Sequence, residues 1–186
     1  MGDAGGAGGA RRCRMDATGG WRADSAEMVR GMRGDLLLMK SGGSLRDRCV
    51  AWFTRGPYVH VEVDLGDGTT IGSHSEDGVS YRPWRFPERV DVVPLSERVA
   101  QERIEAGIAW LVEQLGHGFS WASIADFALP EPMSTFLLGR ESIYNCANLV
   151  AKYVEITGGL ELPYGKRPPM TLSPNDIARA VGLLKR

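Results

Sequence analysis

The chain has 186 residues, which is enough for one domain with a sizeable core and short for two. Its 22 Lys and Arg nearly balance its 23 Asp and Glu, and the formal net charge of −1 gives no overall field to attract nucleic acid or an anionic membrane. No apolar run is long enough to cross a bilayer, and the N-terminus lacks the continuous apolar segment of a secretory signal.

These features predict a cytoplasmic protein with no nucleic-acid partner and no integral membrane segment. The cysteines agree with a reducing compartment. There are three of them, Cys13, Cys49 and Cys146, whereas a disulfide framework in a secreted domain usually has more.

The first segment of the chain is dominated by Gly, Ala and Arg. Such a composition buries too little apolar surface to offset the entropy lost on ordering. We therefore predict a disordered tail over residues 1–32, followed by one folded domain over residues 33–186.

The folded domain is predicted to begin with a strand and a helix. Residues 36–39 form a brief apolar run typical of a buried strand. Residues 44–53 then place Leu45, Cys49 and Trp52 at helical spacing, and Gly56-Pro57 ends that helix. Because Cys49 lies on the apolar stripe, we expect it to be a small buried hydrophobic residue.

A β-hairpin follows. Residues 58–65 alternate apolar and polar side chains, Gly66-Asp67-Gly68 supplies the turn, and residues 69–71 begin the returning strand. Alternation places His60 and Glu62 on the polar face, which is the face suited to a functional site. Residues 79–82 and 90–93 are further strand candidates.

The second half of the chain is predicted to be mainly helical. Ser96 is the expected cap of a long amphipathic helix that Gly116 ends, and residues 119–128 predict another short helix. Near the C-terminus, Ser173-Pro174 is typical of an N-cap followed by proline in the first turn.

Between these helices lies the feature that points to chemistry. Cys146 opens a helix-like run that Gly158-Gly159 ends. A thiol needs a base to become a thiolate near neutral pH, and both a helix N-terminus and a nearby imidazole favour the thiolate. Cys146 together with His60 therefore suggests a cysteine nucleophile and its base.

The residues around this pair resemble the permuted NlpC/P60 papain-like superfamily, in particular its YiiX-like and lecithin retinol acyltransferase-like branches. The similar stretches are Gly34-Asp35-Leu36-Leu37-Leu38, Tyr58-Val59-His60-Val61-Glu62-Val63, Leu65-Gly66-Asp67-Gly68, Asp77-Gly78-Val79 and Ile143-Tyr144-Asn145-Cys146-Ala147-Asn148-Leu149-Val150. The resemblance runs from about Arg33 to about Gly158.

This resemblance implies an α+β fold, a small antiparallel sheet packed by helices in a circularly permuted papain-like arrangement. It implies acyl transfer through Cys146 and His60, with a peptide or acyl substrate and commonly a peptidoglycan stem peptide. Lipid esters are substrates in the acyltransferase branch. A phage particle or other export machinery would bring such a protein to the cell wall.

The third member of the site departs from the resemblance. Relatives usually carry a polar residue on the strand after the hairpin turn, where this chain has Gly72. The neighbours Ser73 and His74 are candidates. Glu62 is favoured, because a carboxylate on the strand of His60 can hold the imidazole tautomer. A backbone carbonyl, which would leave a dyad, is the remaining alternative.

Two alternatives to a cysteine enzyme stay open, a zinc site and a binding or structural module. A zinc site would use His, Cys and Glu ligands, but HxxxH and CxxC spacings are absent, and the proposed chemistry needs no cofactor. A binding or structural module that retains the fold without chemistry is the alternative from a different class, with Gly72 as its best support.

Overall fold

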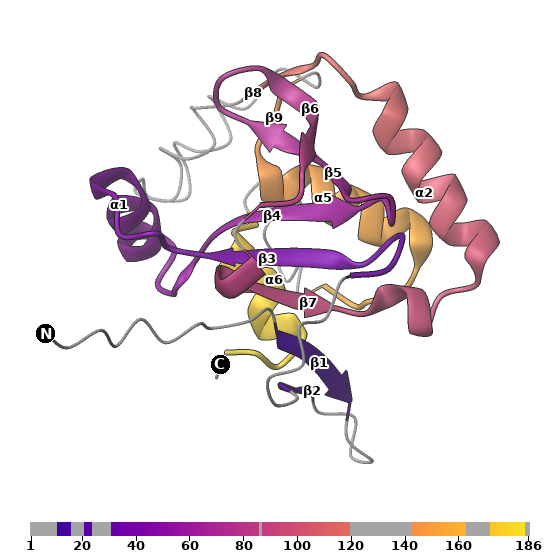
Figure 1. Ribbon diagram of the computed structural model, residues 1–186, viewed down its shortest axis with the longest axis horizontal. Coiled ribbons are helices and arrows are strands. Elements are labelled where there is room, and N and C mark those ends of the chain that lie inside the picture. Colours follow the sequence, from indigo (N-terminus) through magenta and orange to yellow (C-terminus); the bar gives the residue numbers. More distant parts are fainter. Residues whose placement is uncertain are drawn as a thin grey trace, which may run out of the picture.

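The computed structural model describes residues 11–15, 21–23, 31–85, 87–119, 143–162 and 172–184. Within these residues seven strands form one sheet in the order β2-β1-β7-β3-β4-β5-β6 (Figure 1). The strands are β1 (Arg11–Met15), β2 (Trp21–Ala23), β3 (Leu36–Lys40), β4 (Tyr58–Asp64), β5 (Thr69–His74), β6 (Gly78–Pro83) and β7 (Val90–Val93). Neighbouring strands are antiparallel except β1 and β7.

Four α-helices occur in the described part of the chain, together with two short 3-10 helices and a second, parallel strand pair. The α-helices are α1 (Leu45–Phe53), α2 (Gln101–Glu113), α5 (Cys146–Thr157) and α6 (Pro174–Ala180). The short elements are η1 (Pro87–Arg89), η2 (Leu95–Glu97), β8 (Gly118–Phe119) and β9 (Ile143–Tyr144). The predicted α+β class, a small, mainly antiparallel sheet packed by helices, is confirmed.

None of the helices in the described ranges has the length and apolar character needed to span a membrane.

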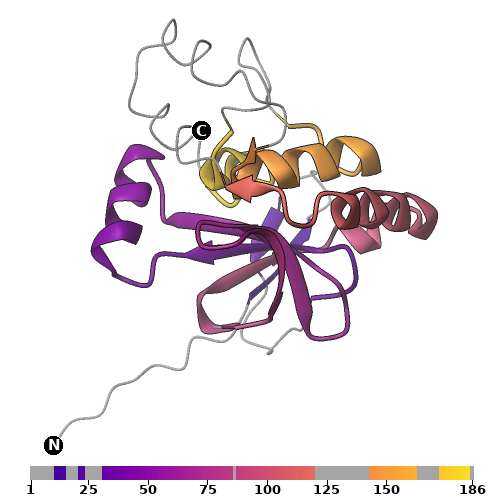
Figure 2. The same ribbon diagram turned by 90° about the horizontal axis from the view of Figure 1, so that it is seen from above.

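The main core lies where α2 and α5 pack side by side on one side of the sheet (Figure 2). Tyr153 of α5 is completely buried, and its hydroxyl donates a 2.8 Å hydrogen bond to the carbonyl oxygen of Gly34. A Cβ at Gly107 of α2 would lie 2.7 Å from the Tyr153 ring, so a glycine is needed where the two helices meet. These contacts fix the position of α5 relative to the sheet.

Two strands lie within the segment for which the composition predicts a disordered tail. β1 pairs with β7, and β2 pairs with β1. Backbone pairing at the edge of a sheet does not require apolar side chains, so composition alone misses it. The other residues of the predicted tail up to residue 30 lie outside the described ranges.

The helix α1 forms as predicted, but it presents its apolar stripe to solvent. Leu45 is 78% exposed and Trp52 is 75% exposed, while Thr54, just after the helix, is buried. Cys49 is also exposed, so the prediction of a buried Cys49 was wrong. Helical spacing identifies the stripe, but it does not show that α1 projects from the end of β3 and β4 (Figure 1).

The long amphipathic helix predicted after Ser96 is present as α2, but Ser96 does not cap it. The N-cap residue is Ala100, which makes no side-chain capping bond. Ser96 belongs to η2, and its hydroxyl donates a 2.6 Å hydrogen bond to Asp35. The short helix predicted over residues 119–128 lies outside the described residues, except for Phe119, which ends β8.

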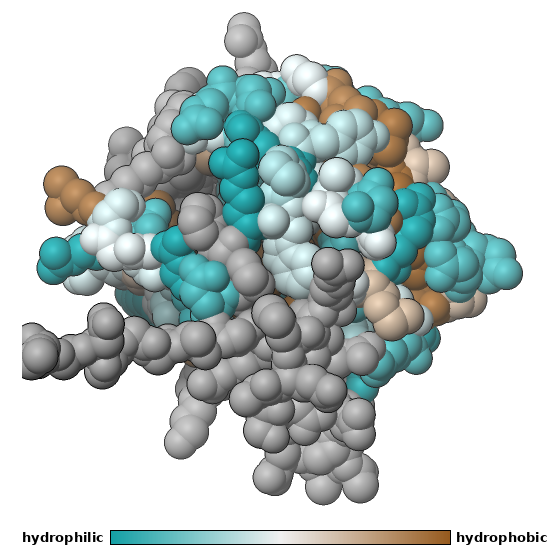
Figure 3. All heavy atoms as spheres, in the orientation of Figure 1, coloured by the Kyte–Doolittle hydropathy of each residue, from teal (hydrophilic) through white to brown (hydrophobic). Residues whose placement is uncertain are grey.

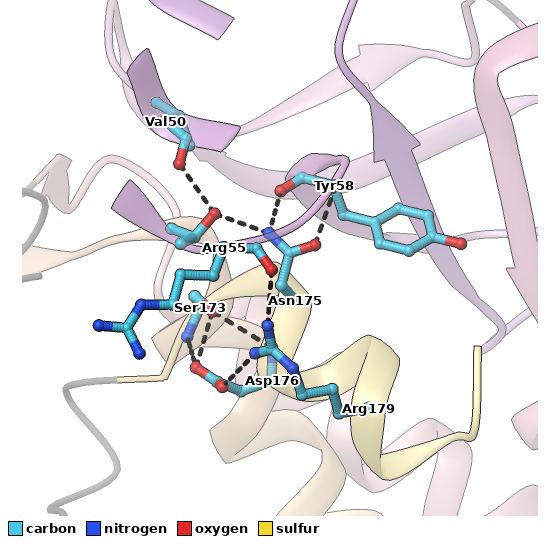
Figure 4. Close-up of polar contacts among 8 residues, drawn as sticks. Val50, Arg55, Tyr58, Ser173, Asn175, Asp176 and Arg179 are labelled. Carbon is cyan, nitrogen blue, oxygen red and sulfur yellow. Dashed lines mark hydrogen bonds and ion pairs between the residues drawn. The ribbon is translucent and has the colours of Figure 1, made fainter. Parts of the chain in front are cut away.

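The helix α6 anchors the start of β4, as Figure 4 shows. Asn175, fully buried, accepts a 3.0 Å hydrogen bond from the Tyr58 backbone N–H and donates a 2.8 Å bond to the Tyr58 carbonyl oxygen. The predicted cap is confirmed, because Ser173 and Asp176 form a reciprocal capping box. Arg179 adds a 2.7 Å hydrogen bond to the carbonyl oxygen of Arg55. The strand that carries His60 is therefore held from its first residue.

Candidate active site

A pocket of about 480 Å³ lies where α1, the sheet and the start of α5 meet. The sheet contributes His60, Glu62 and His74, and the start of α5 contributes Asn145 and Cys146. Segments far apart in the sequence thus bring the predicted nucleophile and base into one cavity.

Cys146 is the first residue of α5 and is 8% exposed. Asn145 caps the helix, because its side-chain oxygen accepts a 2.7 Å hydrogen bond from the backbone N–H of Asn148. Gly158 ends the helix in the left-handed conformation, with φ of 66°, so both predicted boundaries are confirmed. The position at the helix N-terminus exposes Cys146 to the positive end of the helix dipole.

His60 contacts both of its predicted partners. Its side chain forms a hydrogen bond with the Cys146 side chain, and Nε2 lies 2.9 Å from Oε1 of Glu62. Burial lowers the pKa of His60, but the interactions with Cys146 and Glu62 outweigh burial and raise it to about 10. Because Glu62 engages Nε2, Nδ1 is the nitrogen that remains for Cys146.

Glu62 is 3% exposed and uses both carboxylate oxygens. Oε1 faces His60, and Oε2 accepts a short hydrogen bond from the Thr70 hydroxyl on the neighbouring strand. Burial raises the pKa of Glu62, but the hydrogen bond and the charge of His60 outweigh it and lower the pKa to about 2. The site therefore holds a carboxylate against an imidazolium.

Gly72 explains how Glu62 fits. A Cβ atom at position 72 would lie 2.8 Å from Cγ of Glu62, which is closer than real Cβ contacts allow. The glycine leaves open the space over β5 that the side chain of Glu62 occupies. Gly72 has no polar side chain of its own, but the carboxylate of Glu62 on the adjacent strand β4 occupies the space beside it.

The other candidates for the third position have different surroundings. Ser73 is buried, and its hydroxyl donates a 2.7 Å hydrogen bond to the carbonyl oxygen of Tyr144, which ties β5 to the segment before Cys146. Nε2 of His74 lies 3.6 Å from Oε1 of Glu62. Burial lowers the pKa of His74 to about 4, and the charge of His60 adds to this effect. His74 is therefore neutral beside the charged His60–Glu62 pair.

The sequence offered His74 as a candidate for the third position, but it did not reveal that His74 lies opposite His60. The hairpin register pairs Val63 with Ile71 and Asp64 with Thr70, and continuing it places Glu62 opposite Gly72 and His60 opposite His74. The rings of the two histidines are 5.1 Å apart. Counting back from the turn could have found this pair, because residues opposite each other in a hairpin share a face.

His117, the third histidine of the chain, lies outside this cluster. Its Nδ1 is 3.1 Å from the Gln114 side chain, at the end of α2.

Comparison with known proteins adds no family to this description, because the chain matches no family model and no similar curated protein is found.

Proposed function

We propose that the protein is a cysteine hydrolase with a permuted NlpC/P60-like, papain-like arrangement, which cleaves an amide or peptide bond through an acyl-enzyme. The observation that carries the proposal is the position of His60, which touches the thiol of Cys146 on one side and the carboxylate of Glu62 on the other. A nucleophile, a base and a group that orients the base are the parts that nucleophilic catalysis needs.

In this proposal the thiol proton of Cys146 already lies on Nδ1 of His60 before the substrate binds, which makes the ring an imidazolium, and the thiolate of Cys146 attacks the substrate carbonyl carbon. A C–S bond forms, and the carbonyl electron pair moves to oxygen. The backbone N–H groups at the start of α5 stabilise the resulting oxyanion, since the first N–H groups of a helix have no partner within it. His60 then donates its proton to the leaving nitrogen, the C–N bond breaks, and a thioester remains on Cys146.

Water completes the cycle. His60 takes a proton from water, the hydroxide attacks the thioester carbonyl, and the C–S bond breaks to release a carboxylic acid and to restore the thiolate beside the protonated His60. Glu62 acts through His60 in both halves, because it stabilises the imidazolium and holds the ring in place. It is a positioning residue.

The rim of the pocket supports a polar substrate. Asp47, Glu76 and Arg85 line it and offer charges of both signs, which suit a peptide that carries both amino and carboxyl groups. A peptide or amide substrate, such as a peptidoglycan-derived stem peptide, is therefore the first choice.

One observation favours a second candidate, a thioesterase or acyltransferase that acts on lipid acyl groups. The helix α1, which lines the pocket through Val50 and Phe53, exposes Leu45 and Trp52 to solvent. Hydrophobic atoms project at this end of the molecule in Figure 3. An exposed aromatic and aliphatic pair beside the pocket suits a substrate with an apolar chain.

The test is turnover of a mixed panel of peptidoglycan peptides and acyl esters by the wild type, Cys146→Ala and His60→Ala, with circular dichroism to verify folding. We expect activity in the wild type and its loss in both variants, and the preferred compound selects between amide and lipid chemistry. Activity that survives in Cys146→Ala would contradict the mechanism. Folded but inactive wild type would favour a binding module without chemistry.

A further inference from the structure

The mechanism above leaves His74 without a task. His74 lines the same pocket, and its Nε2 is buried without a hydrogen-bond partner among the described residues. Burying a polar nitrogen without a partner costs free energy, and in native structures such a group calls for an explanation. The nitrogen lies 3.6 Å from Oε1 of Glu62, which is too long for a hydrogen bond.

Three potential metal ligands meet at this point. One ring nitrogen of His60, a carboxylate oxygen of Glu62 and one ring nitrogen of His74 all lie within 4.8 Å of one another. Zinc in a tetrahedral site binds nitrogen and oxygen at about 2.0–2.2 Å, which places neighbouring ligand atoms roughly 3.3 Å apart. The separations of 2.9 Å and 3.6 Å between Glu62 and the two histidines lie on either side of that value.

We propose that His60, Glu62 and His74 form a binding site for a divalent transition metal of the zinc class, a proposal that does not depend on the proposed function. Two imidazoles and one carboxylate are a ligand set that zinc and cobalt accept readily, whereas Mg²⁺ and Ca²⁺ prefer sites built of oxygen. Three protein ligands leave the fourth position of a tetrahedral site for water.

The binding site is tested by titrating Zn²⁺ and Co²⁺ into the Cys146→Ala protein, which keeps all three ligands. We expect one equivalent to bind, and we expect His74→Gln in the same background to lower the affinity by more than about tenfold, since even loss of an outer-shell partner costs that much. His117→Gln is the matched histidine control and should bind as tightly as its parent.

Equal binding by the His74→Gln and parent proteins would overturn the inference. So would a failure of Cys146→Ala to bind the metal, together with a thiolate-to-cobalt charge-transfer band in the wild type, because both would show that binding requires Cys146.

Zinc binding in a protein without turnover on any substrate would contradict the proposed function and leave the metal site standing.

Discussion

Glu62 and Gly72 form a complementary pair at the centre of the pocket. The carboxylate needs the space that the missing side chain of Gly72 leaves, and His60 needs the carboxylate to remain charged while buried. A substitution at either position should therefore change the reactivity of Cys146 through its effect on the imidazole of His60.

Replacing Glu62 with Gln tests the charge while keeping the shape. The amide oxygen can still accept a hydrogen bond, but it does not stabilise the imidazolium, so the pKa of His60 should fall from its raised value. We expect kcat/KM to drop by about 100-fold, at the lower end of what a positioned proton-transfer group contributes. A pH–rate profile checks this, because a purely structural role would lower the rate without moving the profile.

Replacing Gly72 with Ala tests the space. The new Cβ would meet Cγ of Glu62 at 2.8 Å and displace the carboxylate from His60. The variant should therefore have a lower kcat/KM and a shifted pH–rate profile, as expected for Glu62→Gln. Gly118→Ala is the matched control, since a Cβ there meets nothing within 4 Å. Equal activity of the two variants would show that the pairing of Glu62 and Gly72 does not matter.

At the scale of elements, the hairpin and α6 together determine where His60 lies. Asn175 satisfies both backbone polar groups of Tyr58, two residues before His60, and donates a 2.6 Å hydrogen bond to Thr54. A Cβ at Gly56 would lie 2.2 Å from the side-chain oxygen of Asn175, so the turn before β4 must be glycine for α6 to approach.

Replacing Asn175 with Ala should therefore destabilise the fold. The variant loses the two hydrogen bonds that Asn175 makes with the Tyr58 backbone and the one it makes with Thr54, and each contributes about 0.5–1.5 kcal/mol. We expect the free energy of unfolding to fall by about 2–4 kcal/mol in urea denaturation. Glu155→Ala, which removes an exposed ion pair to Lys152, is the control and should change it by less than about 1 kcal/mol. Similar losses in both variants would show that α6 does not anchor β4.

Local sequence patterns predict the elements better than their relation to one another. The hairpin, the helix that starts at Cys146 and the capped helix at Ser173 follow from alternation, turn residues and capping residues, which act over a few positions. The exposure of the apolar stripe of α1 depends on residues far away in the sequence. The same is true of the hydrogen bond from Ser96 to Asp35, which Ser96 makes instead of capping α2. Local patterns also do not predict that His74 lies near His60, because this contact depends on the register of the two strands.

For the whole molecule, the pocket predicts how stability depends on pH. The pKa of Glu62 is lowered to about 2 and that of His74 to about 4, so the unfolded chain binds these protons more readily. Stability should fall as pH drops below about 6.5, the unfolded value of histidine, first through His74 and then through Glu62. His74 also faces Arg82 and Asp77, whose charges oppose each other there.

His60 affects the stability of the fold on the alkaline side of the pH range. Its pKa is raised to about 10, so its contribution to stability is complete below about pH 6.5 and is lost as pH rises towards 10. Urea denaturation across pH, in the presence of a chelator, should give a stability maximum near pH 6.5. His74→Gln should flatten the fall between about pH 6.5 and 4. An unchanged acid limb in that variant would contradict the assigned protonation states.

The central claim, that His60 activates Cys146, is tested most directly by the rate at which Cys146 is alkylated as pH changes. Cys13 and the exposed Cys49 must first be replaced by serine, so that one thiol remains. A thiol without a charged partner ionises near pH 8.5, so it reacts slowly at about pH 6. We predict that Cys146 reacts at about pH 6 at least tenfold faster than in His60→Ala, as expected for a thiol paired with an imidazolium. A rate that rises only near pH 8.5 and is unchanged in His60→Ala would contradict the account.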